Sequence, residues 1–187
     1  MSTRSIIAKQ IGEDQYLTIF CHYDGYPDDN GATLVKHYNT PERVDALLAL
    51  GDLEVLCEKI EPTPQTPHTA DAPQPGVTVA MRRDMELSGC EAAEMTREEL
   101  IEPEYEGIEY TYIFNQDGKW LYFPVGEEYE WRDLKEDLEN DTIHLAEPDA
   151  ELMEALGLTG EEWDEDLEED NIEQEMYGGI DNGEKSR

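Results

Sequence analysis

Apolar and polar positions near the start of the chain follow the pattern of two adjacent strands. Residues 5–10 and 15–23 are rich in β-branched and aromatic side chains, and turn-forming residues 12–14 separate them, which predicts an antiparallel β-hairpin. Apolar residues occupy both alternating faces of the second strand, so we expect its centre to be buried on both sides. Residues 24–31 are rich in Asp, Gly, Asn and Pro and are expected to form a loop.

Two helices are expected after this loop, over residues 32–38 and 40–51. The second has the clearer signals, because Thr40 is a favourable N-cap, Pro41 stands at the first helical position and Gly51 suits a C-terminal cap. Its buried stripe is predicted to contain Val44, Leu47, Leu48 and Leu50.

The middle of the chain begins with residues 61–76, which hold five prolines and predict an extended linker or a mobile loop. Strand and helix signals follow, and the clearest is a second hairpin, in which an Asn-Gln-Asp-Gly turn joins two aromatic, β-branched segments. We expect a strand at 77–83, a helix at 91–100 with Thr96 as an alternative N-cap, and hairpin strands at 108–114 and 119–123.

The last third of the chain is acidic and mainly helical in pattern. Trp131, Leu134 and Leu138 recur at helical spacing among Asp and Glu residues, which predicts an amphipathic acidic helix. Further acidic helices are expected to begin at the caps Asp149 and Thr159, the second of them presenting Trp163 and Leu167.

These elements predict an α+β fold: an antiparallel sheet with helices on one face and an acidic helical C-terminal region. Residues 1–60 are expected to form a β-hairpin plus helices, and residues 61–76 a Pro-rich linker or loop. Residues 77–163 are expected to add strands and acidic helices to the same domain. Residues 164–187 are so acidic that we expect a largely disordered tail.

Charge is the property that most narrows the possible partners. The 187 residues contain 47 Asp and Glu against 13 Lys and Arg, a formal net charge of −34. Residues 1–83 carry 12 acidic and 7 basic side chains, or −5, whereas residues 84–187 carry 35 and 6, or −29. Such a surface repels other polyanions, which argues against direct binding to nucleic acid or anionic lipid and favours a basic protein as the partner.

Other features bear on the compartment. No stretch of about 18 apolar residues predicts a membrane span, and the first residues lack the apolar core of a signal peptide. Three widely spaced cysteines, Cys21, Cys57 and Cys90, form neither a disulfide framework nor a zinc pattern. We therefore expect a protein of the reducing cytoplasm that uses no metal or other cofactor.

Two groups of residues form a distinctive pattern: 19–27 (IFCHYDGYP), Gly31, Leu34, His37, Tyr38 and 47–53 (LLALGDL) near the N-terminus, and 112–114 (YIF) with 118–120 (GKW) in a later hairpin. The first group resembles small phage and prophage proteins with a "YCHWDGYP…HY…LGD" N-terminal pattern, and the hairpin is similar to their C-terminal part. The resemblance implies a phage origin and a bacterial host cell, and it implies no particular chemistry.

Cys21, His22, Asp24 and His37 are the candidates for a catalytic or metal site. Cys21 and His22 are adjacent in a predicted strand, so their side chains point to opposite faces and cannot readily share one metal ion. A Cys–His catalytic pair also needs a third group that orients the imidazole, and the sequence has no such signature. We expect Cys21 in the core, His22 at the sheet surface and no enzymatic activity.

An acidic run near the C-terminus has most of the spacing of a calcium-binding loop. Glu169 occupies the sixth position, where the sharp turn of an EF-hand requires Gly, and a run this acidic meets the spacing by chance. No dedicated metal site is predicted from it. The residues at positions 1, 3, 5, 7 and 12 are Asp164, Asp166, Glu168, Asp170 and Glu175.

The leading hypothesis is that ordered acidic helices imitate a nucleic acid. Duplex DNA has one negative charge per about 1.7 Å of its axis, and carboxylates on packed helices approach that density. We therefore predict a phage-encoded, DNA-mimicking inhibitor, of anti-CRISPR or anti-restriction type, that blocks the nucleic-acid-binding groove of a host defence protein. The predicted partner-binding residues are Glu127, Glu128, Glu130, Asp133, Glu136, Asp137, Glu139, Glu161, Glu162, Asp164, Glu165 and Asp166.

Two alternatives stay open. One is a small enzyme that uses the Cys21, His22, Asp24 and His37 region. The other is an acidic adaptor that binds a basic protein without displacing its nucleic acid, and competition between nucleic acid and this chain distinguishes it from a mimic.

Overall fold

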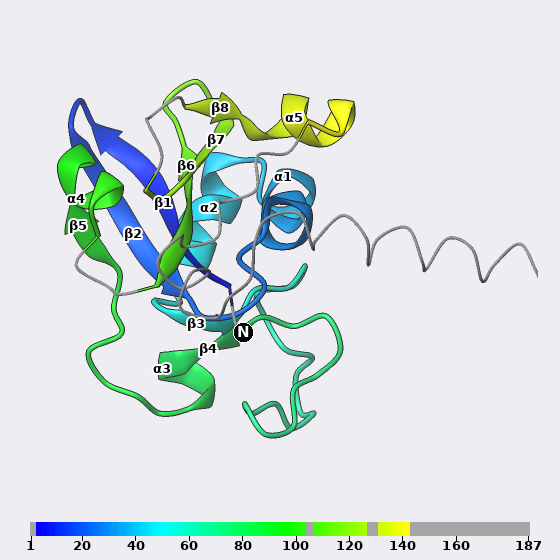
Figure 1. Cartoon of the computed structure of the whole chain (residues 1–187). Coiled ribbons are helices and arrows are strands. Elements are labelled where there is room, and N and C mark those ends of the chain that lie inside the picture. The colour runs from blue at the N-terminus through cyan, green and yellow to red at the C-terminus, as the bar shows by residue number, and fades with distance from the viewer. Residues whose placement is uncertain (1–2, 104–106, 127–130, 143–187) are drawn as a thin grey trace, which may run out of the picture. The chain divides into compact units, whose positions relative to one another are not determined.

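The computed structural model describes residues 3–103, 107–126 and 131–142, which belong to one compact unit. They form an eight-stranded sheet with short helices packed on it (Figure 1), so the predicted α+β class with a largely antiparallel sheet is confirmed. The strands are β1 (Arg4–Gly12), β2 (Gln15–Cys21), β3 (Leu53–Val55), β4 (Val79–Ala80), β5 (Ala93–Met95), β6 (Ile108–Phe114), β7 (Trp120–Pro124) and β8 (Arg132–Asp133). The helices are η1 (a π-helical turn, Pro27–Gly31), α1 (Ala32–His37), α2 (Pro41–Leu48), α3 (Met81–Asp84), α4 (Arg97–Ile101) and α5 (Leu134–Asn140).

The sheet joins the two predicted hairpins through a parallel pair of strands. Its order is β4-β3-β2-β1-β6-β7-β8, and β5 also pairs with β2. Both hairpins, β1–β2 and β6–β7, are antiparallel as predicted. β1 runs parallel to β6, with Ile6 opposite Thr111 and Ile7 opposite Tyr112, and β2 runs parallel to β3. The sheet is therefore mixed, because two of its neighbouring pairs are parallel.

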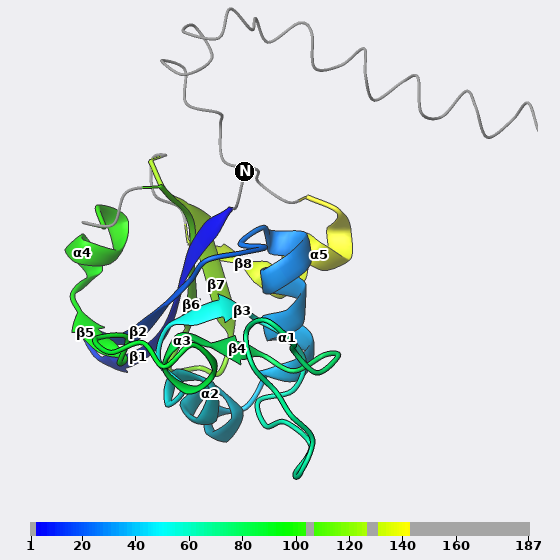
Figure 2. The same cartoon turned by 90° about the horizontal axis from the view of Figure 1, so that it is seen from below.

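Apolar clusters lie on both faces of the sheet. Ile7 belongs to a cluster with residues of α1, α2 and α5, whereas Ile6, its neighbour in β1, packs with Leu100 of α4 on the other face. Helices consequently cover both faces (Figures 1 and 2), which corrects the prediction of helices on one face. β2 is buried from both sides at Thr18 and Ile19, as predicted for its centre.

The helix signals after the first loop are confirmed in detail. The Thr40 hydroxyl accepts a hydrogen bond from the amide of Arg43, and Pro41 is the first residue of α2. Gly51 has φ of +77° and donates its amide to the carbonyl of Leu48. The Gly51 backbone therefore ends this helical segment in a conformation that favours glycine.

Three predicted elements have different bounds in the structure. The expected helix at 91–100 begins only at Arg97, where Thr96 forms a capping box with Glu99, and the residues before it form β5 beside β2. The expected strand at 77–83 is short, because Met81 begins α3. Trp131 precedes α5 and packs edge-on against Phe123 at a ring distance of 4.8 Å. The predicted helices and tail beyond residue 142 lie outside the described residues.

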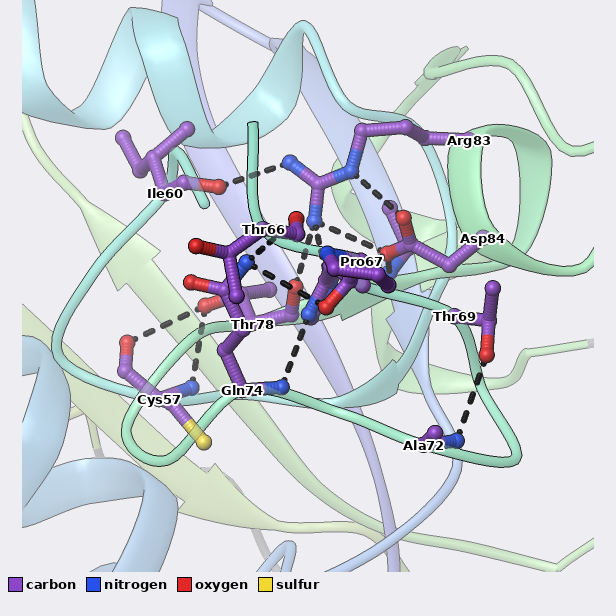
Figure 3. Close-up of polar contacts among 12 residues, drawn as sticks. Cys57, Ile60, Thr66, Pro67, Thr69, Ala72, Gln74, Thr78, Arg83 and Asp84 are labelled. Carbon is purple, nitrogen blue, oxygen red and sulfur yellow. Dashed lines mark hydrogen bonds and ion pairs between the residues drawn. The ribbon is translucent and has the colours of Figure 1, made fainter. Parts of the chain in front are cut away.

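The Pro-rich segment 61–76 is a loop whose two ends meet. The Lys59 amide donates to the Gly76 carbonyl at 3.0 Å, and the Thr78 amide donates to the Lys59 carbonyl at 2.8 Å. Inside the loop, the Gln74 side chain spans the turn, since its Nε2 donates to the Thr66 carbonyl at 2.9 Å (Figure 3). Side-chain hydrogen bonds therefore add to the backbone hydrogen bonds of this loop, such as the pair between Thr69 and Ala72.

Gly51 and Gly89, which directly precede Asp52 and Cys90 in the sequence, allow a matched test of the fold. Gly51→Ala is expected to destabilise the protein by more than Gly89→Ala, although both residues have positive φ (+77° and +78°). The left-handed backbone alone costs about 1 kcal/mol for alanine. A Cβ at Gly51 would also collide with the Cys90 carbonyl, whereas a Cβ at Gly89 has nothing within 4 Å. Urea unfolding of both variants measures the difference, and equal losses would contradict this packing.

Candidate acidic interaction surface

Four of the twelve predicted partner-binding residues lie in the described part of the chain, at and inside α5. Asp133 is the N-cap of this helix and accepts a hydrogen bond from the Glu136 amide at 3.2 Å. Leu134 is fully buried and holds α5 against the core. The other eight, Glu127, Glu128, Glu130, Glu161, Glu162, Asp164, Glu165 and Asp166, lie outside the described residues.

Asp137 is buried and serves the fold rather than the surface. Its carboxylate accepts hydrogen bonds from the Tyr122 hydroxyl at 2.8 Å and from Nη2 of Arg132 at 2.9 Å. Thr142 Oγ1 donates a third at 3.1 Å. Burial acts to raise the pKa of Asp137, but these hydrogen bonds outweigh it and hold the pKa below its usual value. Asp137 therefore anchors α5 to β7 and β8 and is not available to a partner.

The other carboxylates at and inside α5 differ in whether they form ion pairs. Asp133 forms an ion pair with Lys119 at 2.9 Å, and Glu139 forms an exposed pair with Lys135 at 3.7 Å. Exposed pairs of this kind contribute little to stability and exchange readily with another cation. Glu136 is exposed and has no ion pair within the described residues. Glu136 and Glu139 are thus the α5 residues best placed to meet a basic surface.

A second group of acids comes from the N-terminal half of the chain. Asp24, Asp28 and Asp29 are exposed in the loop and η1 turn that follow β2. η1 packs directly on α5, since a Cβ added at Gly31 would lie 3.1 Å from a methyl carbon of Leu134. In Figure 2 the blue segment that leads into α1 lies next to the yellow α5. We call the exposed carboxylates of η1, its preceding loop and α5 the acidic surface: Asp24, Asp28, Asp29, Glu136 and Glu139.

This surface does not depend on the C-terminal residues. The described residues include 26 acidic and 11 basic side chains, a net charge of −15. The sequence interpretation missed Asp28 and Asp29, because it treated residues 24–31 as a turn. The high density of aspartates in residues 24–31 was the one sequence signal for an acidic site there. The position of these aspartates beside α5 depends on how the strands pair, which the local sequence does not specify.

A pocket of about 320 Å³ opens beside η1 and α1. Burial, and then the charges of Asp28 and Asp24, raise the pKa of Asp29 above its usual value. The pocket is polar and predominantly acidic. Its polar and charged lining residues are Asp24, Asp28, Asp29, Asn30, Thr33, Lys36 and His37.

The four candidate catalytic residues are only partly brought together. Asp24 and His37 line the same pocket. Cys21 is fully buried, and burial raises the pKa of its thiol to about 12, which suppresses the thiolate needed for nucleophilic attack. His22 instead lies with its ring 4.5 Å from that of Tyr23 in an edge-on contact. This arrangement has no Cys–His pair.

His68 of the Pro-rich loop and Asp84 of α3 form a histidine–carboxylate contact. Both side chains are 2% exposed, and His68 Nε2 lies 3.2 Å from Asp84 Oδ2. The Gln74 amide donates to His68 Nδ1 at 3.0 Å, so both ring nitrogens are engaged and neither is free to act as a general base. Arg83 also donates to Asp84. This cluster fastens the loop to α3.

No further site is found among the described residues. None of their His, Cys, Asp and Glu side chains forms a group of three or more arranged to hold a metal ion. None of the helices in residues 3–103, 107–126 and 131–142 is long and apolar enough to cross a membrane. The chain matches no protein-family model, no curated protein sequence and no solved structure.

The role of Asp137 as an anchor is tested by truncation. Asp137→Ala is expected to lower the free energy of unfolding by about 3 kcal/mol, because it removes the buried carboxylate to which the Tyr122 hydroxyl and the Arg132 guanidinium donate. Glu139→Ala, the control on the same helix, is expected to change it by at most about 0.5 kcal/mol. Urea denaturation at neutral pH measures both.

The same pair of variants has a pH signature. A carboxylate with a lowered pKa in the folded state stabilises the protein above its unfolded pKa, and this stabilisation is lost as the pH falls through the folded pKa. The difference in stability between the wild type and Asp137→Ala should therefore shrink on acidification. A difference that stays constant from neutral to acidic pH would show that the ionised form of Asp137 is not what anchors α5.

The burial of Cys21 predicts selective alkylation. In the native protein at about pH 8, iodoacetamide is expected to modify the partly exposed Cys57 and Cys90 and to leave Cys21 unmodified, because the reagent attacks accessible thiolates. In denaturant all three should react. Peptide mass spectrometry reads each cysteine separately. Rapid native labelling of Cys21 would revive the small-enzyme alternative.

Proposed function

We propose that this protein is an acidic mimic of nucleic acid that occupies the basic groove of a nucleic-acid-binding protein. The observation that carries the proposal is the acidic surface, where exposed carboxylates from η1 and its preceding loop adjoin those of α5 on one folded unit. Carboxylates on packed elements are held at fixed separations, as phosphates are along a duplex. The mechanism is competitive occlusion, in which the carboxylates replace phosphates at the Lys and Arg side chains of the groove.

The overall charge supports this class of partner. A chain of net charge −34 attracts a basic protein over distances of the order of a Debye length, about 8 Å at physiological ionic strength, and repels nucleic acid itself. The resemblance to phage and prophage proteins makes a bacterial defence nuclease, such as a restriction or CRISPR effector, the partner we favour. The protein would then act in the host cytoplasm as a phage-encoded inhibitor.

Two double variants with the same change in charge test the surface. Glu136→Lys with Glu139→Lys is expected to weaken inhibition by at least about tenfold, or about 1.4 kcal/mol, because it places cations against the basic groove. Glu98→Lys with Glu102→Lys makes the same change of charge on α4 and its C-cap residue, on the other face of the sheet, and is expected to have a much smaller effect. Displacement of labelled DNA from the effector, captured from host lysate at low salt, is the measurement.

Salt provides the second readout of the same experiment. Association between the protein and the effector should weaken steeply as salt rises, because many ion contacts form at once. Equal inhibition by the two double variants would count against the acidic surface. Binding to the effector without any displacement of DNA would instead identify an adaptor.

A further inference from the structure

His68 connects the Pro-rich loop 61–76 to α3 through both nitrogens of its ring. Its Nδ1 accepts a hydrogen bond from the Gln74 amide at 3.0 Å, and its Nε2 lies 3.2 Å from Asp84 Oδ2. A backbone amide can only donate, so Nδ1 carries no proton and the single ring proton is on Nε2, where it is donated to Asp84. The contacts of His68 therefore require the neutral imidazole.

The charges around His68 oppose a second ring proton. The side chains of His68 and Asp84 are each 2% exposed, and Arg83 donates to both carboxylate oxygens of Asp84, at 2.7 and 2.8 Å (Figure 3). Arg83 thus balances the charge of Asp84, and its Nη2 lies 3.3 Å from His68 Nε2. Glu61 and Asp71, the carboxylates of the loop itself, are exposed to solvent. A protonated imidazole would therefore add a positive charge to a buried pair that is already neutral, which is costly.

A second ring proton would also remove the contact between His68 and Gln74. It would bind at Nδ1, which would then face the Gln74 amide as one donor facing another. The side chain of Gln74 spans the turn of the loop, because its Nε2 donates to the Thr66 carbonyl and its Oε1 accepts from the Thr63 amide, both at 2.9 Å. Movement of Gln74 away from His68 would therefore disturb the hydrogen bonds that give the loop its shape.

We propose that His68 is a pH-sensitive latch, which holds the Pro-rich loop on α3 when its ring is neutral and releases the loop when its ring is protonated. Histidine side chains ordinarily gain a proton between about pH 5 and pH 8, and release is expected in that range. The backbone hydrogen bonds of Lys59 with Gly76 and Thr78 do not titrate, so the base of the loop stays closed while the residues between move. This inference goes beyond the proposed function and does not depend on it.

Hydrogen exchange measured by NMR on the full-length protein tests the latch. The protection of the Gln74 amide, corrected for the intrinsic effect of pH on exchange, is expected to fall at least about fivefold between about pH 7.5 and pH 5.5. His68→Gln retains an acceptor and a donor but takes up no proton in this range, so its Gln74 protection should change by less than about twofold. His22→Gln, the control, removes a histidine outside the loop and should respond as the wild type does.

The wild-type protein supplies a second readout that needs no variant. The ring resonances of His68 and the amide resonance of Gln74 should change with one common midpoint, because the same proton breaks their contact. Thermal melting at both pH values checks that each protein stays folded. The latch is overturned if the Gln74 amide does not follow the His68 ring, or if its protection falls equally in His68→Gln.

Discussion

The parallel pairing of β1 with β6 determines how the rest of the molecule is arranged. Separately, the two hairpins would be two-stranded units, which are marginally stable in water. Joined at their inner strands, they place β1 at the centre of the sheet, where Ile6 and Ile7 enter two different cores. The same pairing sets the loop after β2 above β6, so that the Tyr112 hydroxyl reaches the Gly25 carbonyl. The position of the acidic pocket is thus a consequence of strand order.

The described carboxylates divide into those that hold the fold and those that face outward. Asp84 and Asp137 are buried, and in each the hydrogen bonds and charge of a neighbouring arginine outweigh the effect of burial and lower the pKa. Asp52 fills a break in the ladder, where its carboxylate accepts from the Phe20 amide between the β5 and β3 pairings of β2. The exposed acids have few bases to neutralise them. Most of the negative charge is therefore left on the surface, where it repels itself and attracts cations.

Elements whose ends are set by residues close together in the sequence could be predicted from the sequence alone. The cap at Thr40, the glycine at Gly51 and the turn between β6 and β7 each depend on residues a few positions apart, and all three are confirmed. The parallel β1–β6 pairing joins residues about a hundred positions apart, and no local pattern specifies it. β5 was missed for the same reason, since Ala93–Met95 is a strand only because β2 offers an unpaired edge.

The candidate site likewise has features that the sequence could predict and features that only the packing determines. Its acidic character could be read from composition, but the assignment of individual residues depended on packing. Asp137 has the same spacing pattern as its exposed neighbours in α5, and only the positions of Tyr122 and Arg132 make it a buried anchor. Asp28 and Asp29 have the composition of turn residues, and only the packing of η1 on Leu134 places them beside α5.

Rigid placement of these charges is what distinguishes a mimic from an acidic tail. A flexible polyanion and a folded one attract a basic groove equally well at long range, since attraction depends on net charge. Once in contact, the flexible chain loses conformational freedom for each carboxylate that it fixes, whereas carboxylates on η1 and α5 are already positioned by Gly25, Asn30 and Leu134. In the proposed complex, the fold would therefore contribute to the lifetime more than to the rate of encounter. The buried contacts beneath the acidic surface would matter to such binding as much as the charges themselves.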